Sequence, residues 1–137
     1  MKVFVDSDVI LDVLVERKDF TYSAKILEYL EKGTIKGFTS PVVLANIFYI
    51  ISKEKDKNKA WEALRKLRLL FKITKLNENI VDKALASGFK DFEDAIQYYS
   101  ALDSKVNYLV TRNKSDYIGE EVVIVTPAEV LAIIEKN

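Results

Sequence analysis

Short apolar runs alternate with longer amphipathic segments along the whole chain. The short runs are typical of buried strands and occur at 2–5, 35–39, 71–74, 108–111 and 122–125. The longer segments place apolar residues at helical spacing and predict helices over 9–14, 20–32, 41–53, 57–70, 79–86, 91–103 and 127–135. Strands that alternate with helices predict an α/β fold with a parallel sheet of about five strands and helices on both faces.

Length and composition agree with one globular unit. The chain has 137 residues, of which 49% are hydrophobic and 31% are charged, so we expect a single domain over 1–137. No apolar run approaches the ~20 residues of a membrane span. Asp6 and Asp8 interrupt the first apolar stretch, which argues against a signal peptide. We therefore expect a cytoplasmic protein without membrane contact.

The residue types that are absent exclude whole classes of chemistry. The chain has no Cys and no His, which removes disulfides, thiolate zinc sites, cysteine nucleophiles and every Ser-His-Asp arrangement. Catalysis must then use carboxylates, lysine, tyrosine, hydroxyls or a bound metal. An oxygen-only ligand set suits hard cations such as Mg²⁺ or Mn²⁺.

The charge balance restricts how a nucleic acid could bind. The 21 basic and 21 acidic residues give a net charge of zero, so a local patch would have to attract it. Two clusters are candidates, although a solvated helix face is the favoured explanation for both. The clusters are Lys53, Lys55, Lys57 and Lys59, and Arg65, Lys66 and Arg68.

Acidic residues follow the first strand directly, at Asp6 and Asp8. In an open α/β sheet this position is the crevice outside the carboxyl ends of the strands, where ligands bind. One of the two carboxylates can cap the next helix, because helix N-termini favour negative charge. Two together indicate a metal cation.

The segment that starts at Asp91 places a second set of acids near the same edge. Asp91 and Asp94 share one flank of a helix, whereas Glu93 projects to the other side. This helix precedes a strand, so its start should lie at the same end of the sheet as Asp6. Ordinary capping by first-turn acids explains the segment equally well. The expected buried stripe of the helix is Phe92, Ala95, Ile96 and Tyr99.

Polar groups also follow two other strands. The fourth strand ends in Thr111, and Asn113 and Asp116 follow it, where a plain turn is the alternative. Ser40 follows the second strand and is most simply a helix cap. Asn46 interrupts a strongly apolar helix, so it lies either at a solvent edge or against a polar site.

Taken together, these segments bring Asp6, Asp94 and Asp116 to one end of one sheet. Several carboxylates cannot share a small site without a compensating cation, and a divalent metal supplies it. Such a metal can lower the pKa of a bound water and neutralise a phosphoryl oxygen.

The chain resembles the PIN-domain family, the fold of many metal-dependent ribonucleases and of VapC-type toxins. The resemblance rests on VFVDSDVILD at 3–12, TSP at 39–41, DFEDAIQY at 91–98, LVTRNKSDY at 109–117 and IVTPAE at 124–129. It implies a three-layer α/β/α fold, Mg²⁺ or Mn²⁺ as cofactor and RNA as substrate. It also implies that Asp6, Asp94 and Asp116 are the catalytic metal ligands. By the same resemblance, groups that support them or contact phosphate are Ser7, Asp8, Ser40, Asn46, Asp91, Thr111 and Asn113.

The chain departs from the family pattern at two positions. Asp8 stands where many members carry Asn, and Asn46 stands where most active members carry Glu. An Asn can accept a hydrogen bond from metal-bound water but cannot act as a charged ligand or base. Asp8, Asp12 or Asp91 could compensate for the missing charge, although a solvated surface acid is the favoured explanation for Asp12.

Three functions follow as hypotheses. The leading one is a metal-dependent ribonuclease, as the toxin of a toxin–antitoxin pair, with an antitoxin partner and a homodimer formed through the helices at 42–52 and 61–70. The second, motivated by Asn46, is a catalytically weak module that binds RNA or an antitoxin. The third is a phosphatase with Asp6 as covalent nucleophile, suggested by Asp6-Ser7-Asp8-Val9. The chain is short for that third class and lacks its Gly-Asp motif after a strand.

Overall fold

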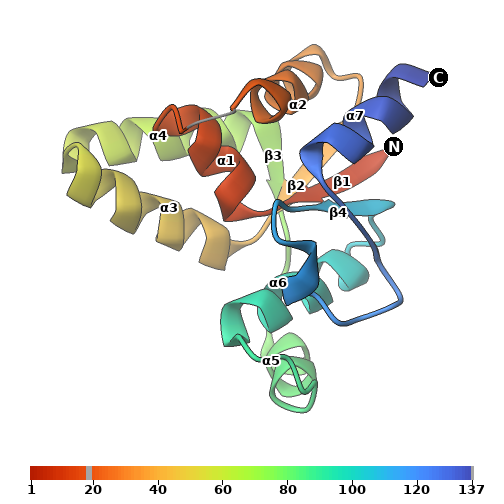
Figure 1. Ribbon diagram of the computed structural model, residues 1–137. Coiled ribbons are helices and arrows are strands. Elements are labelled where there is room, and N and C mark those ends of the chain that lie inside the picture. Colours follow the sequence, from red (N-terminus) through yellow and green to blue (C-terminus); the bar gives the residue numbers. More distant parts are fainter. Residues whose placement is uncertain (18–19, 137) are drawn as a thin grey trace.

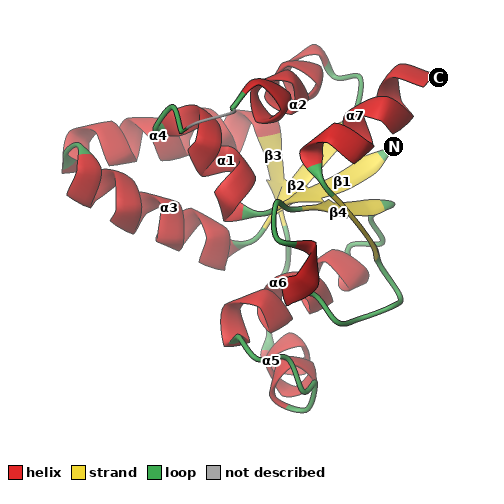
Figure 2. Cartoon of the chain, in the orientation of Figure 1, coloured by secondary structure: helices red, strands yellow, loops and turns green. Residues whose placement is uncertain are grey.

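The computed structural model describes residues 1–17 and 20–136 of the chain. Its strands form one five-stranded sheet in the order β3-β2-β1-β4-β5, and every neighbouring pair is parallel (Figure 2). The strands are β1 (Lys2–Val5), β2 (Lys36–Thr39), β3 (Phe71–Ile73), β4 (Tyr108–Val110) and β5 (Val123–Val125). The parallel five-stranded sheet expected from the sequence is confirmed.

Helices cover both faces of this sheet. In Figure 1, α1, α2 and α7 lie on one side, and α5 and α6 lie on the other. The pair α3 and α4 pack along each other and extend past the sheet near β3. The helices are α1 (Ser7–Leu14), α2 (Thr21–Lys32), α3 (Pro41–Glu54), α4 (Lys57–Leu70), α5 (Glu78–Leu85), α6 (Phe92–Asp103) and α7 (Pro127–Lys136), with a short 3₁₀ helix η1 (Lys114–Asp116). Each of the seven lies within two residues of its predicted bounds, and the three-layer α/β/α arrangement is confirmed.

The central strand β1 sits at the point where the direction of the chain across the sheet reverses. The chain moves from β1 outward through β2 to β3, and then crosses back to β4 on the other side of β1. Val3, Phe4 and Val5 are all 0% exposed, which makes β1 the middle of the core. The crevice at the carboxyl ends of β1 and β4 is therefore the topological switch point, where α/β sheets bind ligands.

The predicted buried stripe of α6 is wrong at Phe92, which is 51% exposed. The helix is packed on two sides: Tyr98 and Ala101 join the main core, whereas Ala95 and Ile96 form a smaller cluster with residues of α5. Its buried surface is therefore broader than a single stripe, and Phe92 in the first turn is outside it. No helix within the described residues is long and apolar enough to span a bilayer.

Candidate active site

Asp6 occupies the switch point and is held from three sides. It follows β1 directly and caps α1, because its Oδ1 accepts a hydrogen bond of 2.7 Å from the backbone N–H of Ser7. Its Oδ2 accepts from the hydroxyl of Thr111 at 3.0 Å and from the hydroxyl of Tyr117 at 2.9 Å. The residue is only 7% exposed. Asp6 is thus held at the carboxyl edge of the sheet by its cap on α1 and by the hydroxyls of the loop after β4.

Asp8 lies beside Asp6 and is held by the same loop. Its Oδ2 accepts hydrogen bonds from the Thr111 hydroxyl at 3.3 Å, the Arg112 backbone N–H at 3.2 Å and the Asn113 side-chain amide at 3.1 Å. Its Oδ1 is buried and has no hydrogen-bond partner within the described part of the chain. Such an oxygen can accept a hydrogen bond from water or coordinate an ion.

The electrostatics of the pair oppose full ionisation. Burial raises the pKa of Asp6 above its ordinary value, against the four hydrogen bonds that lower it. Burial and then the neighbouring charge of Asp6 raise the pKa of Asp8 to about 6. Two carboxylates that destabilise each other's charge in this way need an opposite charge at neutral pH.

The acids of α6 face the same region. Asp91 caps α6 through the backbone N–H of Asp94, and both line a hollow of about 390 Å³ together with Asp116 of η1. Burial, and then the charges of Asp91 and Asp6, raise the pKa of Asp94 to about 7, and Asp116 contributes to the same shift. The pKa of Glu93 is raised as well, by burial first and then by Asp91 and Asp6. Asp94 therefore lies within the electrostatic reach of both Asp6 and Asp116.

Of the other predicted residues, Asn46 reaches the site and Ser40 does not. The amide of Asn46 on α3 donates to Ser7 Oγ at 3.3 Å, and the Ser7 hydroxyl donates to Asp6 Oδ1 at 3.4 Å. Ser40 is fully buried and caps α3, where its hydroxyl oxygen accepts a hydrogen bond from the backbone N–H of Val43. Asn46 thus touches the carboxylates through one hydroxyl.

Tyr117 belongs to the site and was missed by the sequence analysis. Its hydroxyl donates to Asp6, its ring is buried, and burial together with the Asp6 charge raises its pKa above the ordinary value. Phe89 packs edge-on against that ring at 6.2 Å. The signal in the sequence is its position at the end of the segment 109–117, because a tyrosine there can bury its ring and direct its hydroxyl to a polar site.

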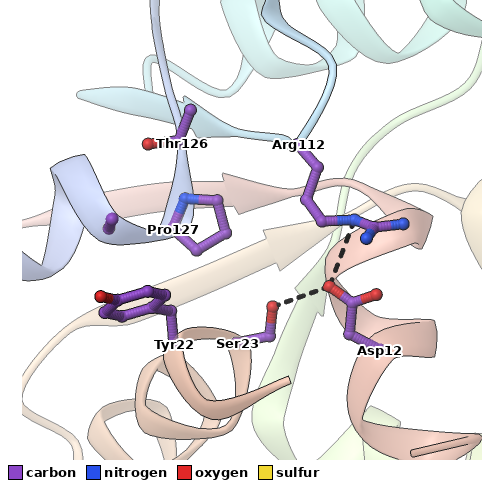
Figure 3. A pocket seen from close by; sticks show the side chains of 7 residues that line it. Asp12, Tyr22, Ser23, Arg112, Thr126 and Pro127 are labelled. Atoms are coloured by element: carbon purple, nitrogen blue, oxygen red, sulfur yellow. Dashed lines mark hydrogen bonds and ion pairs between the residues drawn. The ribbon is translucent and has the colours of Figure 1, made fainter. Parts of the chain in front are cut away.

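The expectation that Asp12 is a solvated surface acid is wrong, because the residue is 0% exposed. Its Oδ2 accepts from the Ser23 hydroxyl at 3.0 Å and pairs with Arg112 Nε at 3.3 Å (Figure 3). The three residues line a pocket of about 320 Å³ between α1, α2 and the start of α7. The cation and the hydroxyl compensate the buried Oδ2, whereas Oδ1 of Asp12 is buried without a hydrogen-bond partner in the described residues. Both partners are distant in sequence, and Arg112 is the residue whose backbone holds Asp8.

The donor set fits a divalent cation, although the described residues hold no ready-made group of three acids around one point. The fit rests on the buried, partnerless Oδ1 of Asp8 and on the raised pKa values of Asp8 and Asp94. All the side chains concerned offer oxygen ligands, which Mg²⁺ and Mn²⁺ prefer.

The fold is an α/β protein with a parallel sheet, and its acidic side chains gather at the switch point, where such proteins bind ligands. Residues 2–115 match the family model described as the PIN domain. The chain therefore belongs to the PIN domain family.

Individual relatives agree with this assignment. The chain is 30% identical to Ribonuclease VapC1 of Aquifex aeolicus over 131 residues, which cover 91% of this chain and 90% of that protein. Its fold is similar to VapBC2 of Rickettsia felis bound to a DNA fragment from its promoter (TM-score 0.71, 17% identity, 92% of this chain and 98% of that one). It is also similar to VapC20 of Mycobacterium tuberculosis, described as a sarcin-ricin loop cleaving toxin (TM-score 0.63, 14% identity, 78% and 86%).

The raised pKa values predict that the metal-free protein loses stability as pH rises. Folding raises the pKa of Asp8 and Asp94, so the native state binds more protons than the unfolded state between about pH 4 and about pH 7. We expect the Tm to fall by roughly 5 °C from about pH 5 to about pH 7.5 in EDTA, and less in Mn²⁺. No imidazole titrates in this interval, because the chain has no His.

The matched control for this measurement is Asp8→Asn, which removes one titrating carboxyl and keeps the side-chain shape. Its Tm in EDTA should change less with pH than that of the wild type. Identical pH profiles for the two proteins would contradict the predicted contribution of Asp8.

Asp12 is buried, whereas the side chain of its partner Arg112 is 42% exposed, and this pair predicts a large loss of stability when only Arg112 is removed. Arg112→Gln leaves a carboxylate that is 0% exposed with a single hydroxyl donor. We expect a loss of roughly 3 kcal/mol in the free energy of unfolding, measured in urea, because an unpaired buried charge is left behind. Adding Asp12→Asn should recover most of this loss. Lys114→Gln, which breaks an exposed pair with Glu129, is the control and should change stability by less than ~1 kcal/mol. Equal effects of the two single variants would refute the assignment.

Proposed function

We propose that this protein is an endoribonuclease that depends on Mg²⁺ or Mn²⁺ and hydrolyses RNA phosphodiester bonds. The observation that carries the proposal is the pair of Asp6 and Asp8, two carboxylates held together at the ligand-binding edge with their pKa values raised. The 30% identity to a protein named Ribonuclease VapC1 supports the reaction type. The similarity to a sarcin-ricin loop cleaving toxin supports RNA as the substrate class.

In this proposal Asp6, Asp94 and Asp116 hold the metal, and Asp8 adds charge beside them. When bound, the metal supplies an acidified water as nucleophile and neutralises a phosphoryl oxygen. The chain's own residues orient the ligands: the hydroxyls of Thr111 and Tyr117 fix Asp6 Oδ2. Fixed ligands place the reacting phosphate and water without reorganisation during the reaction.

We further propose that the protein works in the cytoplasm as the toxin of a toxin–antitoxin pair and forms a homodimer. Support for an antitoxin partner comes from the fold similarity to a structure described as a toxin–antitoxin complex from Klebsiella pneumoniae (TM-score 0.68, 21% identity). Support for a dimer comes from exposed apolar side chains on α3 and α4, namely Tyr49, Trp61 and Leu69. Membership of the PIN domain family argues against the phosphatase hypothesis.

The proposal predicts RNA cleavage that requires both the metal and Asp6. The wild type should cut a mixed RNA pool in Mn²⁺, and EDTA should abolish the cleavage. Asp6→Asn should lower the rate by more than ~100-fold, because loss of a direct ligand exceeds the effect of losing an outer partner. Asp82→Asn on the exposed face of α5 is the control and should cut as the wild type does. Cleavage that persists in Asp6→Asn or in EDTA would contradict the proposal.

A second candidate is a module that binds RNA or an antitoxin without cutting, and Asn46 favours it. The amide at this position brings no charge to the carboxylates, and it donates to Ser7 where a metal site would gain from an acceptor. An absence of cleavage in every RNA tested, with Mn²⁺ binding weaker than millimolar, would favour this module over the enzyme.

Asn46 predicts a gain of metal affinity on substitution. Asn46→Glu adds a carboxylate that approaches Asp6 through Ser7, so we expect Mn²⁺ to bind roughly tenfold more tightly by calorimetry. The same variant should be less stable than the wild type in EDTA, because it adds like charge. Asn46→Gln changes the length without the charge and should show neither effect. Equal Mn²⁺ affinity of the two variants would place position 46 outside the metal site.

A further inference from the structure

Four lysines line one hollow that no part of the proposed catalytic site uses. The hollow measures about 350 Å³ and lies along β2 and β3 beside the C-terminal end of α6. Its basic residues are Lys2, Lys36, Lys72 and Lys75, and all four are exposed. The remaining lining residues are Phe38, Ile73, Thr74, Asp103 and Ser104.

The register of the sheet explains why these lysines meet. Lys2 pairs with Lys36 across β1 and β2, and Phe38 pairs with Lys72 across β2 and β3. Neighbours in register point to the same face, and residues two apart in a strand share a face. The three strands therefore direct Lys2, Lys36, Phe38 and Lys72 to one side of the sheet. Lys75 follows β3 and joins them at its carboxyl end.

The charges of this lysine hollow are uncompensated. None of the four lysines forms an ion pair with a carboxylate in residues 1–17 and 20–136. By contrast, Lys25, Lys32, Lys66, Arg112 and Lys114 each have an acidic partner. Asp103 is the one acid in the lining, against four cations. In a chain whose net charge is zero, this local excess is a positive potential that attracts anions.

Two further features indicate a polar ligand that also carries aromatic rings. Thr74 is 5% exposed, and its hydroxyl has no hydrogen-bond partner within the described residues. A buried hydroxyl in native proteins usually has a partner, and that of Thr74, at the wall of the hollow, lacks one. Phe38 presents its ring in the same hollow, with Lys2 Nζ 5.8 Å from the ring centroid. Lysines around an aromatic ring are the pattern that binds single-stranded nucleic acids.

We propose that the lysine hollow binds the phosphodiester backbone of an RNA strand at a distance from the point of cleavage. This proposal rests on the proposed ribonuclease function and extends it to the binding of the substrate. Helix α6 connects the two regions, because it begins beside Asp94 and ends at Asp103 in the lining of the hollow. Its 12 residues span roughly 18 Å, so only RNA long enough to cover that distance engages both regions.

The lysine hollow supplies the local positive patch that a chain of zero net charge needs to bind RNA. The runs considered from sequence alone are partly engaged elsewhere: Lys53 contacts Tyr49, Lys55 donates to the carbonyl of Leu14, and Arg68 donates to that of Phe71. The acidic edge repels phosphate when no cation is bound. The lysine hollow is attractive whether or not metal is present.

The test compares two triple variants with equal changes of charge. Lys36→Gln, Lys72→Gln and Lys75→Gln remove three charges from the hollow and leave Lys2 on Phe38. Lys53→Gln, Lys57→Gln and Lys59→Gln remove three charges from α3 and α4 as the control. Binding of a fluorescent single-stranded RNA of about 20 nucleotides is measured by anisotropy in EDTA over a range of salt.

We expect the hollow variant to bind at least ~10-fold more weakly at low salt, because each phosphate contact releases counterions. The slope of log K against log salt should decrease by about 2, at ~0.7 for each contact to a single strand. The control variant should keep the slope and affinity of the wild type. Thermal unfolding should show that both variants fold. Equal losses in the two variants, or none in the hollow variant, would overturn the proposal.

Cleavage measurements separate this proposal from the ribonuclease proposal. In Mn²⁺ the hollow variant should show a raised KM for the long RNA with kcat unchanged, and normal kinetics on an RNA too short to span α6. If no protein cuts RNA but the hollow variant still loses binding, the enzyme proposal fails and the binding site stands. If the hollow variant binds RNA normally and loses affinity only for poly-glutamate, the site takes an acidic protein and the RNA proposal is wrong.

Discussion

The burial of two neighbouring carboxylates is the constraint on which the rest of this structure depends. Asp6 and Asp8 both accept from the Thr111 hydroxyl, at 3.0 Å and 3.3 Å, and that hydroxyl has one proton to donate. At any moment one of the two carboxylates lacks this donor. The chain compensates with further donors from the same loop, Tyr117 to Asp6 and Asn113 to Asp8. Each of these contacts requires β4 to lie directly beside β1, which the parallel register provides.

The loop after β4 is consequently shaped by α1. The acids of this helix are Asp6 at its cap, Asp8 in its first turn and Asp12 one turn later. The loop donates a hydrogen bond to, or forms an ion pair with, each of them. Arg112 does so twice, because its backbone N–H donates to Asp8 and its side chain pairs with the buried Asp12. A substitution that removes Asp12 therefore acts on the position of Asp8 as well as on stability. Structural support and placement of the candidate ligands come from the same contacts.

The sequence predicts the elements well because their signals are local, and it predicts the contacts poorly because they are not. Apolar periodicity and caps such as Ser40 are contained in a few neighbouring residues, so they predict the helices and strands of the described residues. Asp12 was misassigned because a lone acid on a helix is usually solvated, and its partners Ser23 and Arg112 come from other elements. Tyr117 was missed for the same reason, since its hydroxyl matters only once β4 lies beside β1.

The lysine hollow is the strongest case of a feature invisible to the sequence pattern. The alternating lysines at 53, 55, 57 and 59 are an evident basic cluster in the sequence, but successive residues of a helix point in different directions. Lys2, Lys36 and Lys72 are more than thirty residues apart, and only the strand register places them on one face. A sheet can therefore concentrate charge from a sequence in which the charges look evenly spread.

The zero net charge of the chain conceals two separated regions of opposite charge. Acids gather where β1 and α6 meet at the carboxyl edge, and uncompensated lysines gather where α6 ends. A polyanion near this surface is repelled at the first region and attracted at the second. A divalent cation reverses only the first of these interactions, because only the carboxylates bind it. If the two proposals hold, metal controls whether an RNA held at the lysines can also approach Asp6, which separates retention of the strand from its entry into the site.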